Sequence, residues 1–172
     1  MGKSEQLDRL RQHIIDSLDC PLKQDATRIV FGKGNPDAQI MFIGEAPGRK
    51  EDERGEPFVG AAGRELDKML RLIDLKTADA YIANILKYRP PNNRNPKKEE
   101  ILRHTPYLTQ QIDIINPRII APLGNFATKF VLAGFDPHQM KDIPGISTLH
   151  GTKHRILKNG KHYLVIPLYH PA

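Results

Sequence analysis

Residues 40–63 read IMFIGEAPGRKEDERGEPFVGAAG, and this stretch decides how the rest of the chain is interpreted. The apolar run at 40–43 is typical of a buried strand, and a helical pattern resumes only after Gly60. Between them lies a segment rich in glycine and proline that carries acids and one aromatic residue. In an open α/β sheet such a loop lies outside the carboxyl end of a strand, where ligands bind. Long loops in compact domains are more often functional than idle, so we predict a ligand site rather than a solvated surface loop.

Strand and helix patterns alternate along the rest of the chain. Core strands are predicted at 39–44, 80–88, 118–123 and 162–168, shorter strands at 27–31 and 155–157, and helices at 3–18, 60–75, 98–115 and 124–132. Strands that alternate with helices of ten or more residues favour a mostly parallel sheet covered on both faces. We therefore predict a three-layer α/β/α sandwich with a central, mostly parallel four-stranded sheet, in one domain over residues 1–172.

Composition excludes several classes of protein. A chain of 172 residues that is 39% hydrophobic can bury a core and is not a disordered chain. No apolar run approaches the ~20 residues that span a bilayer, so we expect no membrane partner. The N-terminal residues are charged and lack the apolar centre of a secretion signal, which predicts a cytoplasmic, prokaryotic or viral-type protein. The single cysteine, Cys20, rules out an internal disulfide.

The balance of charge favours a polyanionic partner. The net charge is +6 and the isoelectric point is about 9.5. Lysine and arginine side chains that neutralise phosphates drive nucleic-acid binding, although a basic chain alone is a weak signal. The cations gather in two loops, one at 89–98 and one at 153–162. The residues that we expect to contact a nucleic-acid partner are Arg89, Arg94, Lys153, His154 and Arg155.

Four side chains are expected to converge at one edge of the predicted sheet. Glu45 leaves the first core strand, Asn84 lies in the second, and His170 follows the last. Phe58 lies in the first loop, where its ring could cover a bound heterocycle. An asparagine amide offers a donor and an acceptor to the edge of a base, a histidine can stabilise developing negative charge, and a carboxylate can orient water. Each has a plainer alternative, namely a turn cap for Glu45, a bulge for Asn84, core packing for Phe58 and a surface turn for His170. The residues by themselves indicate a ligand-binding α/β domain.

Several segments resemble the motifs of the family 4 uracil-DNA glycosylases, in the same order, from about Cys20 to Ala172. They are GEAPG (44–48) with EDERGEPFVGAAG (51–63), NILKYRPPNNRNP (84–96), PRIIAPLG (117–124) and YHPA (169–172). The resemblance implies a monofunctional enzyme of base-excision repair that cleaves the N-glycosidic bond of deoxyuridine in DNA and leaves an abasic site. Such an enzyme must first extrude the base from the stack. The alternatives are a catalytically weak DNA-binding module of the same fold and a glycosylase for deaminated purines.

The resemblance also assigns roles to individual residues. Phe58 matches the aromatic residue that stacks on the extruded base, Asn84 the residue that reads the uracil edge, and His170 the histidine that stabilises the departing uracil. Glu45 and Glu51 match two family carboxylates, and the resemblance leaves open which matters more for activating water. The residues expected to line the substrate site beside them are Gly44, Ala46 and Pro47.

The chain departs from the family pattern at an iron–sulfur site. Family members usually hold a [4Fe–4S] cluster with four cysteines, a ligation that needs four thiolates. The matching positions here are Ser17, Cys20, Tyr88 and His104. We therefore predict that the cluster is absent, that no metal takes its place, and that Tyr88 packs there while His104 hydrogen-bonds to Tyr88 or to Cys20.

The C-terminal part of the family pattern also differs. In the resembling enzymes the histidine motif continues into a loop that enters the duplex and then a helix, whereas this sequence ends at Ala172. Without that loop we expect single-stranded DNA to be favoured over duplex. The expected partner is uracil-containing DNA, single- or double-stranded, bound by a monomer.

Overall fold

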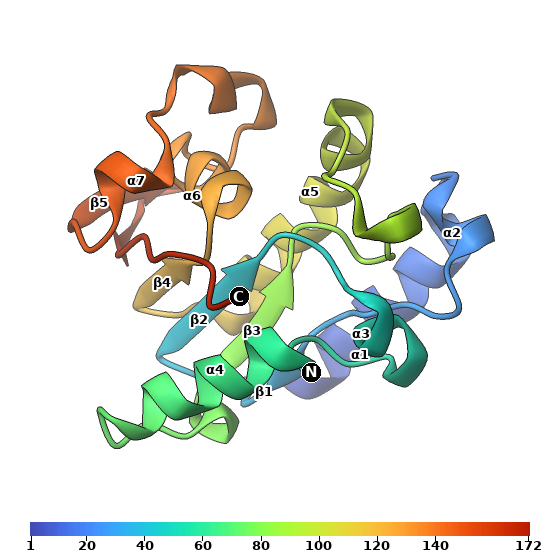
Figure 1. Cartoon of the computed structure of the whole chain (residues 1–172), viewed down its shortest axis with the longest axis horizontal. Coiled ribbons are helices and arrows are strands. Elements are labelled where there is room, and N and C mark those ends of the chain that lie inside the picture. The colour runs from blue at the N-terminus through green and yellow to red at the C-terminus, as the bar shows by residue number, and fades with distance from the viewer.

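The computed structural model describes all residues, 1–172, and its centre is one twisted six-stranded sheet (Figure 1). The strand order is β1-β3-β2-β4-β6-β5. The strands are β1 (Lys33–Gly34), β2 (Ile40–Gly44), β3 (Tyr81–Asn84), β4 (Ile119–Pro122), β5 (His154–Lys158) and β6 (Lys161–Val165). The four inner strands run parallel, whereas β1 and β5 pair antiparallel at the two edges. The predicted four parallel strands are thus confirmed, and two antiparallel edge strands extend them.

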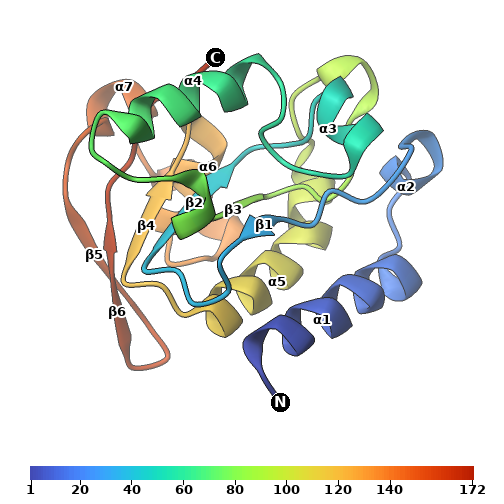
Figure 2. The same ribbon diagram turned by 90° about the horizontal axis from the view of Figure 1, so that it is seen from below.

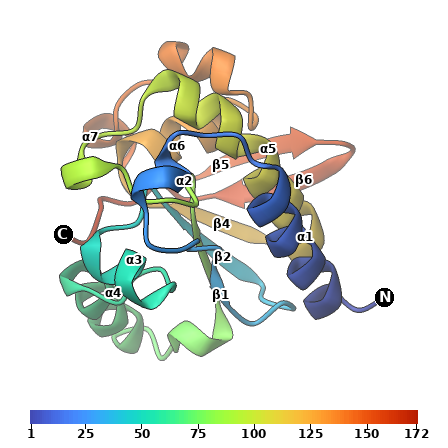
Figure 3. The same cartoon turned by 90° about the vertical axis from the view of Figure 1, so that its right-hand side faces the viewer.

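Helices cover both faces of the sheet, with α1, α5 and α6 on one face and α4 on the other (Figure 3). The helices are α1 (Lys3–Ser17), α2 (Leu22–Asp25), α3 (Arg49–Arg54), α4 (Ala61–Arg71), α5 (Lys98–Ile115), α6 (Asn125–Leu132) and α7 (Ile146–Leu149). Short 3-10 turns are η1 (Thr77–Asp79), η2 (Pro91–Asn93) and η3 (Pro137–Asp142). The termini lie on opposite sides, the N-terminus beside α1 and the C-terminus beside α4 (Figure 2). No helix has both the length and the apolar character that crossing a membrane requires.

The alternation of side chains along β2 divides the core between the two faces. Met41 and Ile43 join a cluster of 27 buried residues under α1, α5 and α6, while Phe42 points to a cluster of 7 residues under α4. Successive side chains of a strand point to opposite faces, so a strand buried on both faces is apolar throughout. This explains the uninterrupted apolar run at 40–43, and the larger cluster supplies most of the hydrophobic stabilisation.

Two predictions about individual elements are wrong. Residues 27–31 form no strand: Ile29 and Phe31 are buried, but the Val30 amide donates to the carbonyl of Lys87 in a single isolated hydrogen bond. The apolar run there reflects burial in the core rather than pairing in the sheet. The helix predicted at 60–75 is also too long, since α4 ends at Arg71 and Ile73 beyond it is exposed, as is Met69 in its last turn. Helix α4 ends at Arg71 and buries only a narrow stripe against the sheet.

The decisive segment after β2 contains a helix of its own. Residues 45–48 leave the strand, and α3 follows and ends at Gly55, whose φ of +75° suits a glycine. The chain then returns through Phe58 to the start of α4. The segment predicted to be an irregular loop is therefore a compact excursion over the carboxyl end of β2.

Candidate active site

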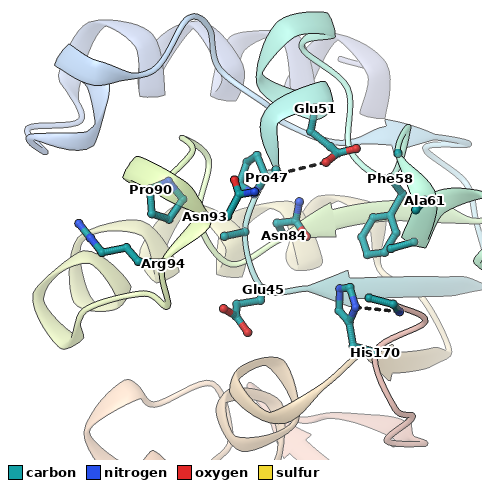
Figure 4. A pocket seen from close by; sticks show the side chains of 15 residues that line it. Glu45, Pro47, Glu51, Phe58, Ala61, Asn84, Pro90, Asn93, Arg94 and His170 are labelled. Atoms are coloured by element: carbon teal, nitrogen blue, oxygen red, sulfur yellow. Dashed lines mark hydrogen bonds between the residues drawn. The ribbon is translucent and has the colours of Figure 1, made fainter.

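A cavity of about 450 Å³ opens at the carboxyl ends of the parallel strands (Figure 4). Its walls come from three places that are distant in the sequence, namely the segment after β2, the end of β3 with the turn that follows, and the C-terminal residues. The lining residues are Glu45, Ala46, Pro47, Gly48, Glu51, Phe58, Gly60, Ala61, Ala62, Asn84, Pro90, Asn93, Arg94, His170 and Ala172. The four side chains that were expected to converge, Glu45, Phe58, Asn84 and His170, all line this one cavity.

Sheet register explains why these residues meet. Gly44 pairs with Asn84 across the parallel strands β2 and β3, so both strands end at the same edge. Leu123 forms a parallel bridge with Leu168, and the Gly124 amide donates to the Leu168 carbonyl at 2.8 Å. The chain after β6 is therefore held against the end of β4, which brings His170 to the cavity.

The Asn84 amide lines the cavity without a hydrogen-bond partner in the protein. Asn84 is only 2% exposed, yet its side chain makes no hydrogen bond within the protein. A Cβ atom at Gly44 would lie less than 3.0 Å from both the Asn84 amide oxygen and the Phe58 ring. Glycine at position 44 thus provides the space in which these two side chains lie, and the Asn84 donor and acceptor remain available to a ligand.

The Phe58 ring is held by an unusual backbone. Phe58 has a φ of +54°, a conformation that non-glycine residues rarely adopt. Gly63 allows it, because a Cβ there would overlap the Phe58 carbonyl. The Phe58 and His170 rings lie 6.0 Å apart between centroids, tilted by 31°. Strained residues of this kind cluster at ligand sites, and here the strain directs an aromatic face toward the cavity.

The His170 imidazole is held as a neutral hydrogen-bond donor. Its Nδ1 accepts from the Ala172 amide at 3.2 Å (Figure 4), so the ring proton of the neutral form is on Nε2. Desolvation by the surrounding atoms lowers the pKa of His170 below its ordinary value. At neutral pH the ring can therefore donate from Nε2 to a ligand atom that gains negative charge.

The two candidate carboxylates differ in what they contact. Both oxygens of Glu51 are occupied, one accepting from the Gly48 amide at 3.1 Å and the other from the Val59 amide at 3.0 Å. Glu51 thereby ties the two ends of the α3 segment together. Glu45 makes no hydrogen bond or ion pair with its side chain, and burial raises the pKa of its carboxyl group. Of the two, only the Glu45 carboxylate has no hydrogen bond to the protein, which favours it as the one that binds water in the cavity.

The basic residues expected to contact DNA fall into two places. Arg94 lines the cavity and forms a bidentate pair with the buried Glu100 (2.7 and 2.8 Å), which raises the pKa of Arg94 and lowers that of Glu100. Arg89 donates to the Asn93 side chain at 2.7 Å beside it. The remaining three lie at the start of β5, away from the cavity lining; they are Lys153, His154 and Arg155.

Sequence reasoning missed several residues that shape the site. Asn93 lines the cavity from a turn with a φ of +55°, and the Asn92-Asn93 pair in a proline-rich turn was the available signal. Lys87, fully buried directly after β3, was also missed, although a lysine within the apolar run 85–88 is an anomaly that can be seen in the sequence.

The positions that match the family's iron–sulfur site do not fit such a cluster. Four thiolates are needed and the chain has one cysteine, Cys20, which is buried. Ser17 is exposed and bonds to His13. No group of three or more His, Cys, Asp or Glu side chains is arranged to hold a metal ion.

The hydrogen bond predicted for His104 is not formed. Its Nδ1 accepts instead from the Lys87 amide at 2.9 Å, and its buried Nε2 has no partner. The rings of Tyr88 and His104 pack edge to face, with centroids 6.3 Å apart. The Lys87 amide is thus the hydrogen-bond partner of the ring, and its contact with Tyr88 is aromatic packing rather than a polar contact. Burial lowers the pKa of His104 to about 3, and the positive charge of Lys87 adds to this effect.

Comparison with known proteins gives a consistent picture. A sequence model described as "Uracil DNA glycosylase superfamily" matches residues 31–172. The chain is 45% identical over 168 residues to the Type-4 uracil-DNA glycosylase of Archaeoglobus fulgidus, covering 98% of this chain and 82% of that protein. It is 38% identical over 170 residues to the Type-4 uracil-DNA glycosylase of Thermotoga maritima, covering 99% of this chain and 83% of that protein. Similarity to the Type-5 uracil-DNA glycosylase of Pyrobaculum aerophilum is weaker: the two are 29% identical over 154 residues, which cover 81% of this chain and 63% of that protein.

Proposed function

Since the chain belongs to the uracil DNA glycosylase superfamily, we propose that it hydrolyses the N-glycosidic bond of deoxyuridine in DNA, releasing uracil and leaving an abasic site for base-excision repair. The observation that carries this proposal is the single cavity in which a free amide, an aromatic face, a neutral imidazole and a free carboxylate meet. The Type-4 uracil-DNA glycosylases that it resembles over nearly the whole chain support the same substrate.

Base selection rests on Asn84 and Phe58. The Asn84 amide nitrogen donates to O4 of uracil and its oxygen accepts from N3–H, while the Phe58 ring stacks on the base. Cytosine presents a donor at position 4 and an acceptor at N3, so it would place donor against donor and acceptor against acceptor. A buried amide left unpaired in this way rejects the wrong base strongly.

Bond cleavage uses His170 and Glu45. As the bond between C1′ and N1 breaks, its electron pair leaves with uracil, and negative charge builds on O2, where the His170 Nε2–H donates. The sugar gains positive charge, which the Glu45 carboxylate stabilises while it orients a water toward C1′. The water oxygen bonds to C1′ and its proton passes to Glu45, whose raised pKa suits it to accept. Glu51 instead keeps the α3 segment folded over the cavity.

We propose that the enzyme works without an iron–sulfur cluster. The four matching positions offer one thiolate, and the buried Cys20, Tyr88 and His104 belong to the packed interior. Metal analysis of the purified protein should find no stoichiometric iron, and the solution should lack absorbance near 400 nm. A brown protein with about four irons per chain would contradict this.

The DNA is held by cations in two places. Arg94 lines the cavity with Arg89 bound to Asn93 beside it, whereas Lys153, His154 and Arg155 lie at the start of β5, and each phosphate contact contributes to affinity in a salt-dependent way. The protein acts as a monomer in the cytoplasm, on single- or double-stranded DNA. Substitution of Lys153 and Arg155 by serine should weaken binding and reduce its salt dependence without changing the rate at saturating enzyme.

Strand scission of a labelled oligonucleotide tests the proposed reaction. The substrate carries one uracil in single- or double-stranded form, is incubated with the protein, and is treated with alkali to cleave abasic sites. Matched substrates carry cytosine, thymine, hypoxanthine or xanthine at the same position. Cleavage confined to uracil supports the proposal; binding without cleavage would indicate a DNA-binding module, and cleavage at the purines would indicate a different base choice.

A further inference from the structure

A lysine is buried directly after β3 without any counter-ion. Lys87 has no exposed surface, and no carboxylate lies within ion-pair distance of its ammonium group. Its Nζ donates to the carbonyl of Asn84 at 2.9 Å, to the carbonyl of Phe31 at 3.2 Å, and to Oε1 of Gln111. A buried charge is costly unless its hydrogen bonds are fully satisfied, so this arrangement calls for an explanation beyond packing.

The surroundings of Lys87 require all three of its N–H donors. Two of the three partners are backbone carbonyls, which can only accept. The third, Gln111, presents its oxygen, because its Nε2 donates to the Phe31 carbonyl at 2.9 Å. A methionine or leucine of similar size would take this donor away from the Asn84 carbonyl and from Oε1 of Gln111, whereas the Phe31 carbonyl would keep its bond from Gln111. The site is therefore built for a donor and not for an apolar side chain.

The carbonyl that Lys87 holds belongs to the residue that faces the substrate. Beyond Asn84 the backbone is fixed on all sides: the Ile85 and Leu86 amides donate to the carbonyls of Gly44 and Glu45, and the Lys87 amide donates to His104. The carbonyl of Asn84 is bound by the Lys87 side chain. Because the Asn84 amide has no hydrogen bond of its own within the protein, its direction depends on this backbone and on packing over Gly44.

We propose that Lys87 is a positioning residue for base recognition: its buried ammonium group fixes the backbone of Asn84 against Phe31 and Gln111, and so directs the Asn84 amide at the edge of the base. This inference rests on the proposed function, in which Asn84 reads uracil. It predicts that Lys87 acts on the reaction only through Asn84, although the two side chains lie on different sides of the strand end.

A double-mutant cycle tests the inference, with the single-turnover rate of uracil release from a single-stranded oligonucleotide at saturating enzyme as the readout. Lys87→Met should slow the wild-type enzyme on the order of 10- to 100-fold, the size of effect expected from a small misplacement. In the Asn84→Ala background the same substitution should change the rate less than about twofold, because nothing remains to be positioned. Oligonucleotide affinity should be unchanged in both backgrounds.

Ile112→Ala is the matched control, since Ile112 is fully buried on α5 next to Gln111 and is not among the three hydrogen-bond partners of Lys87. It should lower the melting temperature and leave the rate unchanged below that temperature. A rate loss from Lys87→Met that is equally large in the Asn84→Ala background, or no loss in the wild type, would overturn the inference.

A second pair of variants covers the case in which Lys87→Met does not fold. Gln111→Leu removes one acceptor and leaves the lysine in place, whereas Gln111→Glu keeps an acceptor of the same shape. The inference predicts a larger loss of uracil release for Gln111→Leu than for Gln111→Glu; equal losses would contradict it. Absence of uracil release by the wild-type protein would instead refute the proposed function itself.

Discussion

The substrate cavity and the buried region around Cys20, Tyr88 and His104 use polar side chains in opposite ways. In the cavity, the Asn84 amide and the Glu45 carboxylate have no partner in the protein and face open space. Around Cys20 the side chains are packed into the larger core, and the one unpaired polar atom, Nε2 of His104, is buried in a residue with no exposed surface. An unpaired polar group marks a functional site when a ligand can reach it, and a cost to stability when none can.

Asn84→Asp should have the largest effect on the cavity. A carboxylate cannot donate to O4 of uracil but can accept from the amino group of cytosine, so discrimination between the two bases should fall by up to about 10⁴-fold. Parallel scission assays with uracil and cytosine oligonucleotides measure the ratio. Unchanged selectivity for uracil would show that Asn84 is not the residue that reads the base.

Glu45→Gln and Glu51→Gln should separate the two carboxylates. Glu45→Gln removes the free carboxylate and should slow uracil release by about 10²–10⁴-fold, with little change in melting temperature. Glu51→Gln should act mainly on stability, because it weakens two hydrogen bonds across the α3 segment. Equal rate losses, or the larger loss in Glu51→Gln, would reverse the assignment.

The pH dependence of the rate gives a further test of Glu45. Burial raises the pKa of its carboxyl group, and the proposed mechanism needs the deprotonated form. The single-turnover rate of the wild type should therefore fall with decreasing pH while the pH is still above the ordinary carboxyl range. That acid limb should be missing from Glu45→Gln.

Gly44→Ala should cost about 10²-fold in rate, because the added methyl group would displace both the Asn84 amide and the Phe58 ring. Gly2→Ala is the matched control, since nothing lies within 4 Å of a Cβ at that position. Thermal melting of both variants distinguishes a displaced site from an unfolded one. An active Gly44→Ala enzyme would mean that the two side chains do not need their present positions.

The buried region should respond to pH through stability rather than rate. The pKa of His104 is lowered to about 3 from 6.5, so the unfolded chain binds this proton first as the pH falls. The free energy of unfolding should therefore decrease between pH 6.5 and about 3, by roughly 5 kcal/mol from this residue. His104→Gln keeps an acceptor for the Lys87 amide but does not titrate. Denaturant unfolding of both proteins across this range should show the smaller pH dependence in the variant.

Features of the fold and the site could be predicted from the sequence where their signal lies within one short segment of the chain. Apolar runs such as 40–43 and turn signals such as Asn116-Pro117 located β2, the end of α5 and the parallel core. The convergence of Glu45, Phe58, Asn84 and His170 followed from strand order and from the family resemblance. Contacts between distant segments were out of reach: the Lys87 acceptors come from Phe31, Asn84 and Gln111, and the occupied oxygens of Glu51 depend on the fold of α3.

The two antiparallel strands at the borders of the sheet have a consequence for behaviour at high concentration. An open strand edge offers unpaired amides and carbonyls to other chains and can seed fibrous aggregates. Here β1 is only two residues long, and β5 places the cationic residues Arg155 and Lys158 on the opposite border. Both edges are therefore poor templates for strand pairing with another chain. This should limit aggregation when many copies bind to one polyanion.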